Sequence, residues 1–189
     1  MIYSQGQHDQ YIYFIEFGQV KSVVSTPSGR NCLVSIRGIG DVLGELGLLY
    51  PTRRETAMAM KSTRLCRVQV ARFRAALVAA NLFDEFVLYL LKQISDQQGV
   101  IANMVTMNSE QRLAAVMLEL AVKIGTRRGE ATYINDRITQ EELAEMVGTT
   151  RSRVGLFLKK FRDRGMIVSD NPAVVVNERL LRSYLRMAR

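Results

Sequence analysis

Histidine, cysteine and tryptophan are scarce in this 189-residue chain, which has one histidine (His8), two cysteines and no tryptophan. Cys32 and Cys66 stand apart among apolar neighbours, and this pattern predicts two buried thiols in a reducing compartment rather than a disulfide. So few imidazole and sulfur ligands exclude zinc sites, iron–sulfur sites and Cys/His catalysis. We therefore predict no metal, no cofactor and no catalytic residue.

Long apolar runs are also missing from the sequence. The stretch 36–49 is interrupted by Arg37, Asp41 and Glu45, well short of the about 20 apolar residues that span a bilayer. The first ten residues are polar and lack the apolar core of a signal peptide. These absences predict a cytoplasmic protein with no membrane partner.

Acidic residues are outnumbered, with 18 Asp and Glu against 26 Lys and Arg and a formal net charge of +8. Residues 1–107 carry 11 basic and 8 acidic residues, whereas the shorter range 108–189 carries 15 and 10. The positive excess is therefore denser in the second part. A polyanionic partner is favoured, and nucleic acid is preferred to a membrane surface because the basic residues do not share a helix with a bare apolar stripe.

The first part of the chain, residues 1–75, has the pattern of a β structure. Short runs of β-branched and aromatic residues alternate with glycine turns, which is typical of a roll or barrel. The pattern begins abruptly at Ile2, so the roll is expected to lack its first strands, and Met1 is either a truncated start or a natural minimal form. The predicted strands are 11–17, 20–25, 32–36, 56–60 and 65–70.

A long helix is predicted over 81–107, with apolar positions at alternating spacings of four and three. This heptad pattern favours a parallel homodimeric coiled coil, and a helix packed on its own domain is the alternative. Gln97 interrupts the pattern, which fixes the register or marks a place where a ligand docks. The predicted dimer seam is Phe83, Val87, Leu90, Ile94, Gln97, Ile101 and Met104.

A new unit is predicted over 108–189, and it begins with a helix from Asn108 or Ser109 to Lys123, followed by a polar turn at 125–130. Thr139 then stands three residues before Glu142, which is the pattern of a helix capping box. Gly148 supplies a sharp turn, and Thr150 can cap a second helix. This spacing predicts a helix-turn-helix.

The second helix buries Val154, Leu158 and Phe161 and turns polar and cationic residues outward, as entry into the DNA major groove requires. Residues 166–168 and 173–176 are expected to form a hairpin, or wing, with its tip at 170–172, and 178–189 a last helix. A solvated helical hairpin with a basic face is the alternative. The predicted DNA contacts are Thr139, Gln140, Thr150, Arg151, Ser152, Arg153 and Lys159.

The order of roll (1–80), long helix (81–107) and winged helix-turn-helix (108–189) resembles the cyclic AMP receptor/FNR (Crp/Fnr) family of bacterial transcription regulators over nearly the whole chain. Residues 138–154 look like the family's helix-turn-helix signature, and 40–46, Gly-Asp-Val-Leu-Gly-Glu-Leu, look like the start of its phosphate-binding cassette. The resemblance implies an α+β fold. It also implies base contacts from Arg151 and Ser152, whereas Leu156 stands where many relatives carry arginine.

In family members that bind cyclic nucleotides, a glutamate of the cassette contacts the ribose hydroxyl and a later arginine contacts the cyclic phosphate, and the resemblance implies the same two positions here. Glu45 matches the glutamate, but the arginine position holds Glu55, whose charge would repel a cyclic phosphate. Arg53 or Arg54 could substitute through a shifted turn, so both outcomes stay open. The candidate effector-pocket residues are Gly44, Glu45, Leu46, Arg54, Thr56, Gln97 and Gln98.

The sequence therefore predicts a homodimeric, sequence-specific regulator of transcription that binds double-stranded DNA, with or without an effector. RNA polymerase is a further candidate partner. The alternatives are a cyclic-nucleotide-dependent regulator and a ligand-sensing module whose helix-turn-helix contacts only protein. An enzyme is disfavoured because no P-loop, Ser/His/Asp set or paired acids occur.

Overall fold

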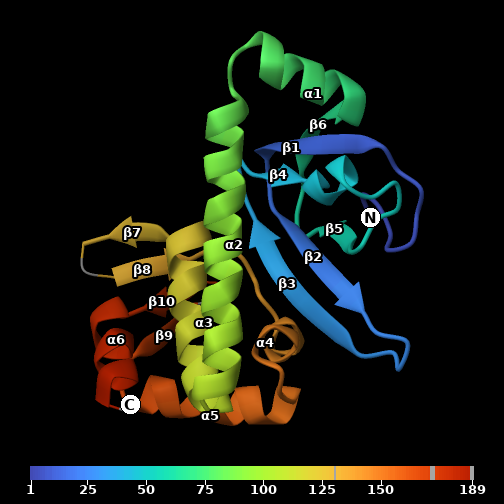
Figure 1. Cartoon of the computed structure of the whole chain (residues 1–189). Coiled ribbons are helices and arrows are strands. Elements are labelled where there is room, and N and C mark those ends of the chain that lie inside the picture. The colour runs from blue at the N-terminus through green and yellow to red at the C-terminus, as the bar shows by residue number, and fades with distance from the viewer. Residues whose placement is uncertain (130, 171–172, 188–189) are drawn as a thin grey trace. The chain divides into compact units, whose positions relative to one another are not determined.

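The computed structural model describes residues 1–129, 131–170 and 173–187, and the chain forms two compact units. Unit 1 contains Met1–Arg30 and Arg37–Thr106, and unit 2 contains Asn31–Ile36 and Met107–Arg189. The elements, coloured along the chain in Figure 1, follow in the order β1 (Tyr11–Phe17), β2 (Val20–Ser25), β3 (Asn31–Arg37), β4 (Val42–Leu43), the 3-10 helix η1 (Glu45–Leu48), β5 (Thr56–Ala59), β6 (Arg64–Gln69), α1 (Val70–Ala79), α2 (Phe83–Thr106), α3 (Ser109–Ile124), β7 (Thr126–Arg128), β8 (Ala131–Ile134), α4 (Gln140–Val147), α5 (Arg151–Asp163), β9 (Ile167–Asp170), β10 (Ala173–Val176) and α6 (Glu178–Met187).

Two small antiparallel sheets make up the β part, with the strand orders β4-β1-β6 and β3-β2-β5. Successive side chains of a strand point to opposite faces, and β1 uses this alternation to supply two cores. Tyr13 and Ile15 enter one core beside Leu43, whereas Ile12 enters the other beside Phe73. Both faces of β1 are therefore buried, and the predicted α+β fold with its β-roll is confirmed.

Aromatic rings join the second core to the helices α1 and α2. Phe73 of α1 meets Phe14 of β1 and Phe86 of α2 edge to face, with ring centroids 5.8 and 5.1 Å apart. Figure 1 shows α1 and the first turns of α2 beside β1 and β6. The helix α1 was not expected, because the β pattern was extended to residue 75, and the structure corrects this by ending β6 at Gln69.

Unit 2 packs α3 against a four-stranded sheet of order β7-β8-β10-β9, and α6 packs against α3. The side chain of Asn108 caps α3 by accepting hydrogen bonds from the amides of Glu110 and Gln111, both at 3.0 Å. The turn predicted at 125–130 is wrong in part, since Thr126–Arg128 forms β7 and pairs with β8. Both wing strands are present as β9 and β10, while 171–172 of the tip and 188–189 of the tail lie outside the described residues.

Two further findings concern exposure. Cys32 and Cys66 are both exposed, so the expectation of buried thiols is wrong. Cys66 lies opposite Phe14 in the β1–β6 ladder and is exposed there. Among the described residues, no helix is both long and apolar enough to cross a bilayer.

Candidate nucleic-acid interface

The helices α4 and α5 form the helix-turn-helix, and local sequence signals set each of their ends. The Thr139 hydroxyl accepts a hydrogen bond from the amide of Glu142, whose carboxylate in turn accepts one from the Thr139 amide. Gly148 ends α4 at φ 69° and ψ 50°, a left-handed conformation that favours glycine. Thr150 caps α5 by accepting from the Arg153 amide. The predicted capping box, turn and second cap are therefore all present.

One face of α5 is buried in unit 2, and the opposite face is open. The predicted core positions Val154, Leu158 and Phe161 are at most 8% exposed. The residues of the outward face are all exposed: Arg151, Ser152, Arg153, Leu156, Lys159 and Arg162. The guanidinium of Arg153 also stacks over the Phe157 ring, 5.8 Å from its centroid.

Polar side chains of α3 hold the helix-turn-helix in place. Arg112 donates to the carbonyl oxygen of Val147 at the end of α4, at 2.8 Å. Glu110 pairs with Lys160 of α5 at 2.7 Å and accepts a hydrogen bond from Tyr184 of α6 at 3.2 Å. Lys160 is therefore a scaffold cation, whereas its neighbour Lys159 points into solvent.

An open hollow of about 500 Å³ lies where α4 begins beside α5. Two arginines, Arg137 and Arg151, line it together with Thr139, Gln140 and the acidic Glu141. The carboxamide of Gln140 lies close to Gly155 of α5, where a Cβ would come within 3.1 Å of its Oε1. The predicted contact residues of α4 and Arg151 of α5 are thus brought together around one hollow.

The side chain of Arg53 packs against the cassette of unit 1 at Gly44. Gly44 has φ 79°, and a Cβ there would clash with the Arg53 guanidinium, so only glycine fits. Arg53 donates to the carbonyl oxygens of Gly44 and Tyr11, pairs with Asp9 at 3.0 Å and lies over the Tyr3 ring. Arg53 is 4% exposed, so its side chain is buried inside the roll.

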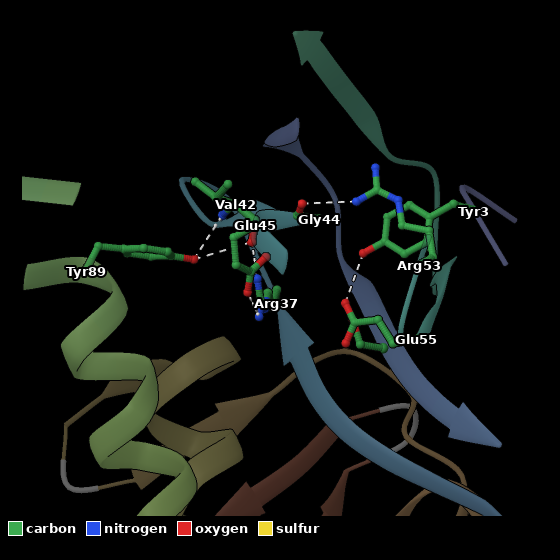
Figure 2. Close-up of polar contacts among 9 residues, drawn as sticks. Tyr3, Arg37, Val42, Gly44, Glu45, Arg53, Glu55 and Tyr89 are labelled. Atoms are coloured by element: carbon green, nitrogen blue, oxygen red, sulfur yellow. Dashed lines mark hydrogen bonds and ion pairs between the residues drawn. The ribbon is translucent and has the colours of Figure 1, made fainter. Parts of the chain in front are cut away.

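The cassette glutamate, Glu45, forms a buried ion pair with Arg37. Arg37 Nη2 lies 2.5 Å from Glu45 Oε1, and Nη1 of the same guanidinium donates to the carbonyl oxygen of Val42 (Figure 2). Burial acts to lower the pKa of Arg37, but the hydrogen bond and charge of Glu45 outweigh it and raise that pKa. The Tyr89 hydroxyl of α2 accepts from the Val42 amide at 3.1 Å, which ties this cluster to α2.

Glu55, at the position where the family pattern has arginine, also has partners within the roll. Its Oε1 accepts hydrogen bonds from Tyr3 at 2.9 Å and Ser22 at 3.0 Å, and Figure 2 shows the Tyr3 contact. Burial, followed by the negative charge of Glu55, raises the pKa of Tyr3. Thr56, the next residue, accepts from the amide of Gln5. The roll thus surrounds its acidic residue with hydroxyl donors.

The predicted effector-pocket residues have different surroundings. Gly44 and Glu45 are in the cassette network, whereas Leu46 is 46% exposed and Arg54 stacks over Tyr50 at the surface. Gln97 and Gln98 are exposed on α2. Sequence reasoning considered Arg53 only as a substitute phosphate contact, and it missed three members of the network: Arg37, Tyr3 and Tyr89. The one available signal was the charge of Arg37 inside an apolar stretch.

The predicted seam of α2 divides into two parts. Leu90 is partly buried and packs on the second core of unit 1 with Tyr89, while Val87 is half-buried. Farther along, Ile94 is 50% exposed and Ile101 is 64% exposed. The later half of the seam therefore presents unpartnered apolar side chains.

Comparison with protein families matches both parts of the chain. Residues 1–79 match the cyclic nucleotide-binding domain, and residues 111–184 match the Crp-like helix-turn-helix domain. The two matches fall on the roll with α1 and on the unit that carries α4 and α5.

Similar proteins are regulators of transcription. The chain is 29% identical over 186 residues to the CRP-like cAMP-activated global transcriptional regulator of Mycobacterium tuberculosis, covering 96% of this chain and 83% of that protein. It is 23% identical over 175 residues to the cAMP-activated global transcriptional regulator CRP of Escherichia coli, covering 91% and 83%. A solved CRP-family regulator of Thermus thermophilus superposes with a TM-score of 0.78 at 25% identity, covering 98% of this chain and 92% of the other.

Proposed function

Since the chain belongs to the cyclic AMP receptor/FNR (Crp/Fnr) family of bacterial transcription regulators, we propose that its homodimer binds a two-fold symmetric DNA site without a cyclic-nucleotide effector. The similar proteins are transcription regulators rather than enzymes. The observation that carries the DNA contact is the outward face of α5, which is open, polar and cationic opposite a fully packed face.

Arg151 and Ser152 are the proposed readers of base edges, because they occupy the exposed first turn of α5. An arginine fork matches the N7 and O6 acceptors of guanine. Arg153 and Lys159 lie farther round the same helix and suit phosphate contacts, which position a protein on the duplex. Thr150 contributes by capping α5, which fixes the conformation of its first turn.

The hollow beside α4 is the proposed seat of a backbone phosphate. Arg137 and Arg151 supply positive charge there, and the amides at the start of α4 add the partial positive charge of a helix N-terminus. Thr139 and Gln140 line the same hollow. Glu141 also lines it and is expected to turn toward solvent when a phosphate binds.

Homodimerisation through α2 is supported by the exposed half of the seam. Ile94 and Ile101 lie seven residues apart, so both project from the same side of the helix. A second copy of α2 packed there would bury them. Two copies of α5 would then bind two half-sites that lie one turn of DNA apart, about 34 Å.

Independence from a cyclic nucleotide is supported by the network inside the roll. Two of the similar proteins are named as cAMP-activated. In this chain the cassette glutamate Glu45 is already paired with Arg37, and the acidic Glu55 replaces the arginine that would meet a cyclic phosphate. Arg53 cannot substitute, since its guanidinium is buried on Gly44, Tyr11 and Asp9. RNA polymerase as a partner stays a prediction.

Selection of DNA sites from a random pool by the purified protein tests this proposal. With no ligand added, we expect an enriched palindrome and an affinity that falls steeply with salt. Arg151→Ala should weaken binding by about 1–3 kcal/mol and relax the preference at one base step of each half-site. Arg127→Ala on β7 is the matched control. Enrichment that appears only when cyclic AMP is added would overturn the effector independence and leave the DNA function intact.

A further inference from the structure

One large apolar side chain stands in the middle of the outward face of α5. Leu156 is 54% exposed, whereas the other large apolar residues of this helix, including Phe157 and Phe161, are at most 8% exposed. A buried leucine side chain stabilises a folded chain more than an exposed one does, so the packing of unit 2 does not explain the position of Leu156.

The geometry of an α-helix places Leu156 among the proposed DNA contacts. At about 100° per residue, Leu156 is rotated by roughly 40° from Ser152 and by roughly 140° from the buried Phe161. Lys159 follows three residues later on the same face, and Arg151 and Arg153 flank Ser152 on either side. An apolar group thus lies on the same exposed helix face as the cations that are proposed to contact DNA.

The chemistry of base edges leaves one attractive partner for such a side chain. In the major groove, the C5-methyl group of thymine is the apolar group that protrudes, whereas cytosine has only a hydrogen at C5 and the purines present donors or acceptors that leucine cannot satisfy. Ser152, one turn earlier, is short and leaves space for the leucine to approach a base. A polar edge facing Leu156 would lose its water without gaining a hydrogen bond.

We propose that Leu156 is a specificity-determining residue that selects thymine at one base step of each half-site through contact with the thymine methyl group. The inference rests on the proposed DNA-binding function and adds to it the identity of a base. It also assigns the outward face two kinds of reader, since Arg151 forms hydrogen bonds and Leu156 excludes polar edges.

Replacement of single thymines by deoxyuridine tests the proposal, because it removes the methyl group and leaves the Watson–Crick pair unchanged. The palindrome selected by the wild-type protein is synthesised with each thymine replaced in turn, and binding is measured by fluorescence anisotropy. The proteins are wild type, Leu156→Ala and the control Val122→Ala, which shortens an exposed apolar residue of α3. Circular dichroism confirms that the variants are folded.

For the wild type and for Val122→Ala, deoxyuridine at one thymine position should weaken binding about four-fold when it is placed in one half-site. Placed at the same position in both half-sites, it should weaken binding about fifteen-fold, as burial of one methyl-sized group per half-site predicts. For Leu156→Ala, the same replacement should have no effect. An equal loss in Leu156→Ala would overturn the proposal, as would a palindrome with no methyl-sensitive thymine, and both results would leave the DNA function intact. Failure to enrich any sequence, with or without cyclic AMP, would instead overturn the DNA function and this inference together.

Discussion

Removal of the Arg37 guanidinium should destabilise unit 1 far more than an ordinary surface substitution does. The side chains of Arg37 and Glu45 are only 8% and 13% exposed, so Arg37→Met leaves a carboxylate largely buried and without its partner. The Val42 carbonyl also loses a donor. Breaking a buried ion pair in this way costs about 3–5 kcal/mol, and the slight exposure of Glu45 places the expected cost near 3 kcal/mol.

Differential scanning calorimetry measures this effect. For a unit of roughly 100 residues, a loss of about 3 kcal/mol lowers the melting temperature by on the order of 15 °C. The transition that contains unit 1 should shift, and the variant Arg127→Ala, which truncates an exposed arginine of β7, should leave it in place. The double variant Arg37→Met/Glu45→Leu should recover most of the loss, because replacing both members of a buried pair by apolar residues is often neutral.

Two outcomes would refute this reasoning. A cost below about 1 kcal/mol for Arg37→Met would mean that Glu45 finds water or another donor once Arg37 is gone. A double variant as unstable as the sum of the two single variants would mean that the residues stabilise the roll independently rather than as a pair.

The remaining predictions concern the dimer and the pH dependence of unit 2. Ile94→Lys combined with Ile101→Lys should give a folded monomer by light scattering, whereas Leu88→Lys, an exposed position on another side of α2, should stay dimeric; a dimer in both cases would place the interface elsewhere. The hydrogen bond from Thr132, followed by the one from Arg182, lowers the pKa of Glu178 from its ordinary 4.5, so its contribution to stability is full above that value and is lost as the pH falls through the lowered pKa. Glu178→Gln should therefore be less stable than wild type in urea at pH 7 and equally stable in strong acid, and an equal deficit at both pH values would contradict the assignment.

Local signals made the helix-turn-helix predictable from sequence. Thr139, Gly148 and Thr150 act within a few residues of their own positions, so spacing along the chain already determines which atoms meet. The buried positions of α5 follow from helical periodicity in the same way. Which of its outward residues contact DNA stays a prediction.

Contacts between distant segments could not be predicted in this way. Tyr3 meets Glu55 across 52 residues, and Tyr89 reaches Val42 across 47. Even the closer pair of Arg37 and Glu45 depends on the turn between β3 and β4, which no composition rule specifies. The strand β7 was missed for another reason, because its three residues are polar and exposed and show no alternation to detect.

The frame that holds α4 and α5 is built from residues that do not face outward. Arg112 and Glu110 of α3 fasten the two helices through Val147 and Lys160, on the inner side of unit 2. Ser152 and Leu156 can therefore change without loosening that frame. Under the proposed function, recognition and support are therefore separable, and single substitutions on the outward face could give new operators, in evolution or by design, without any repacking of the domain.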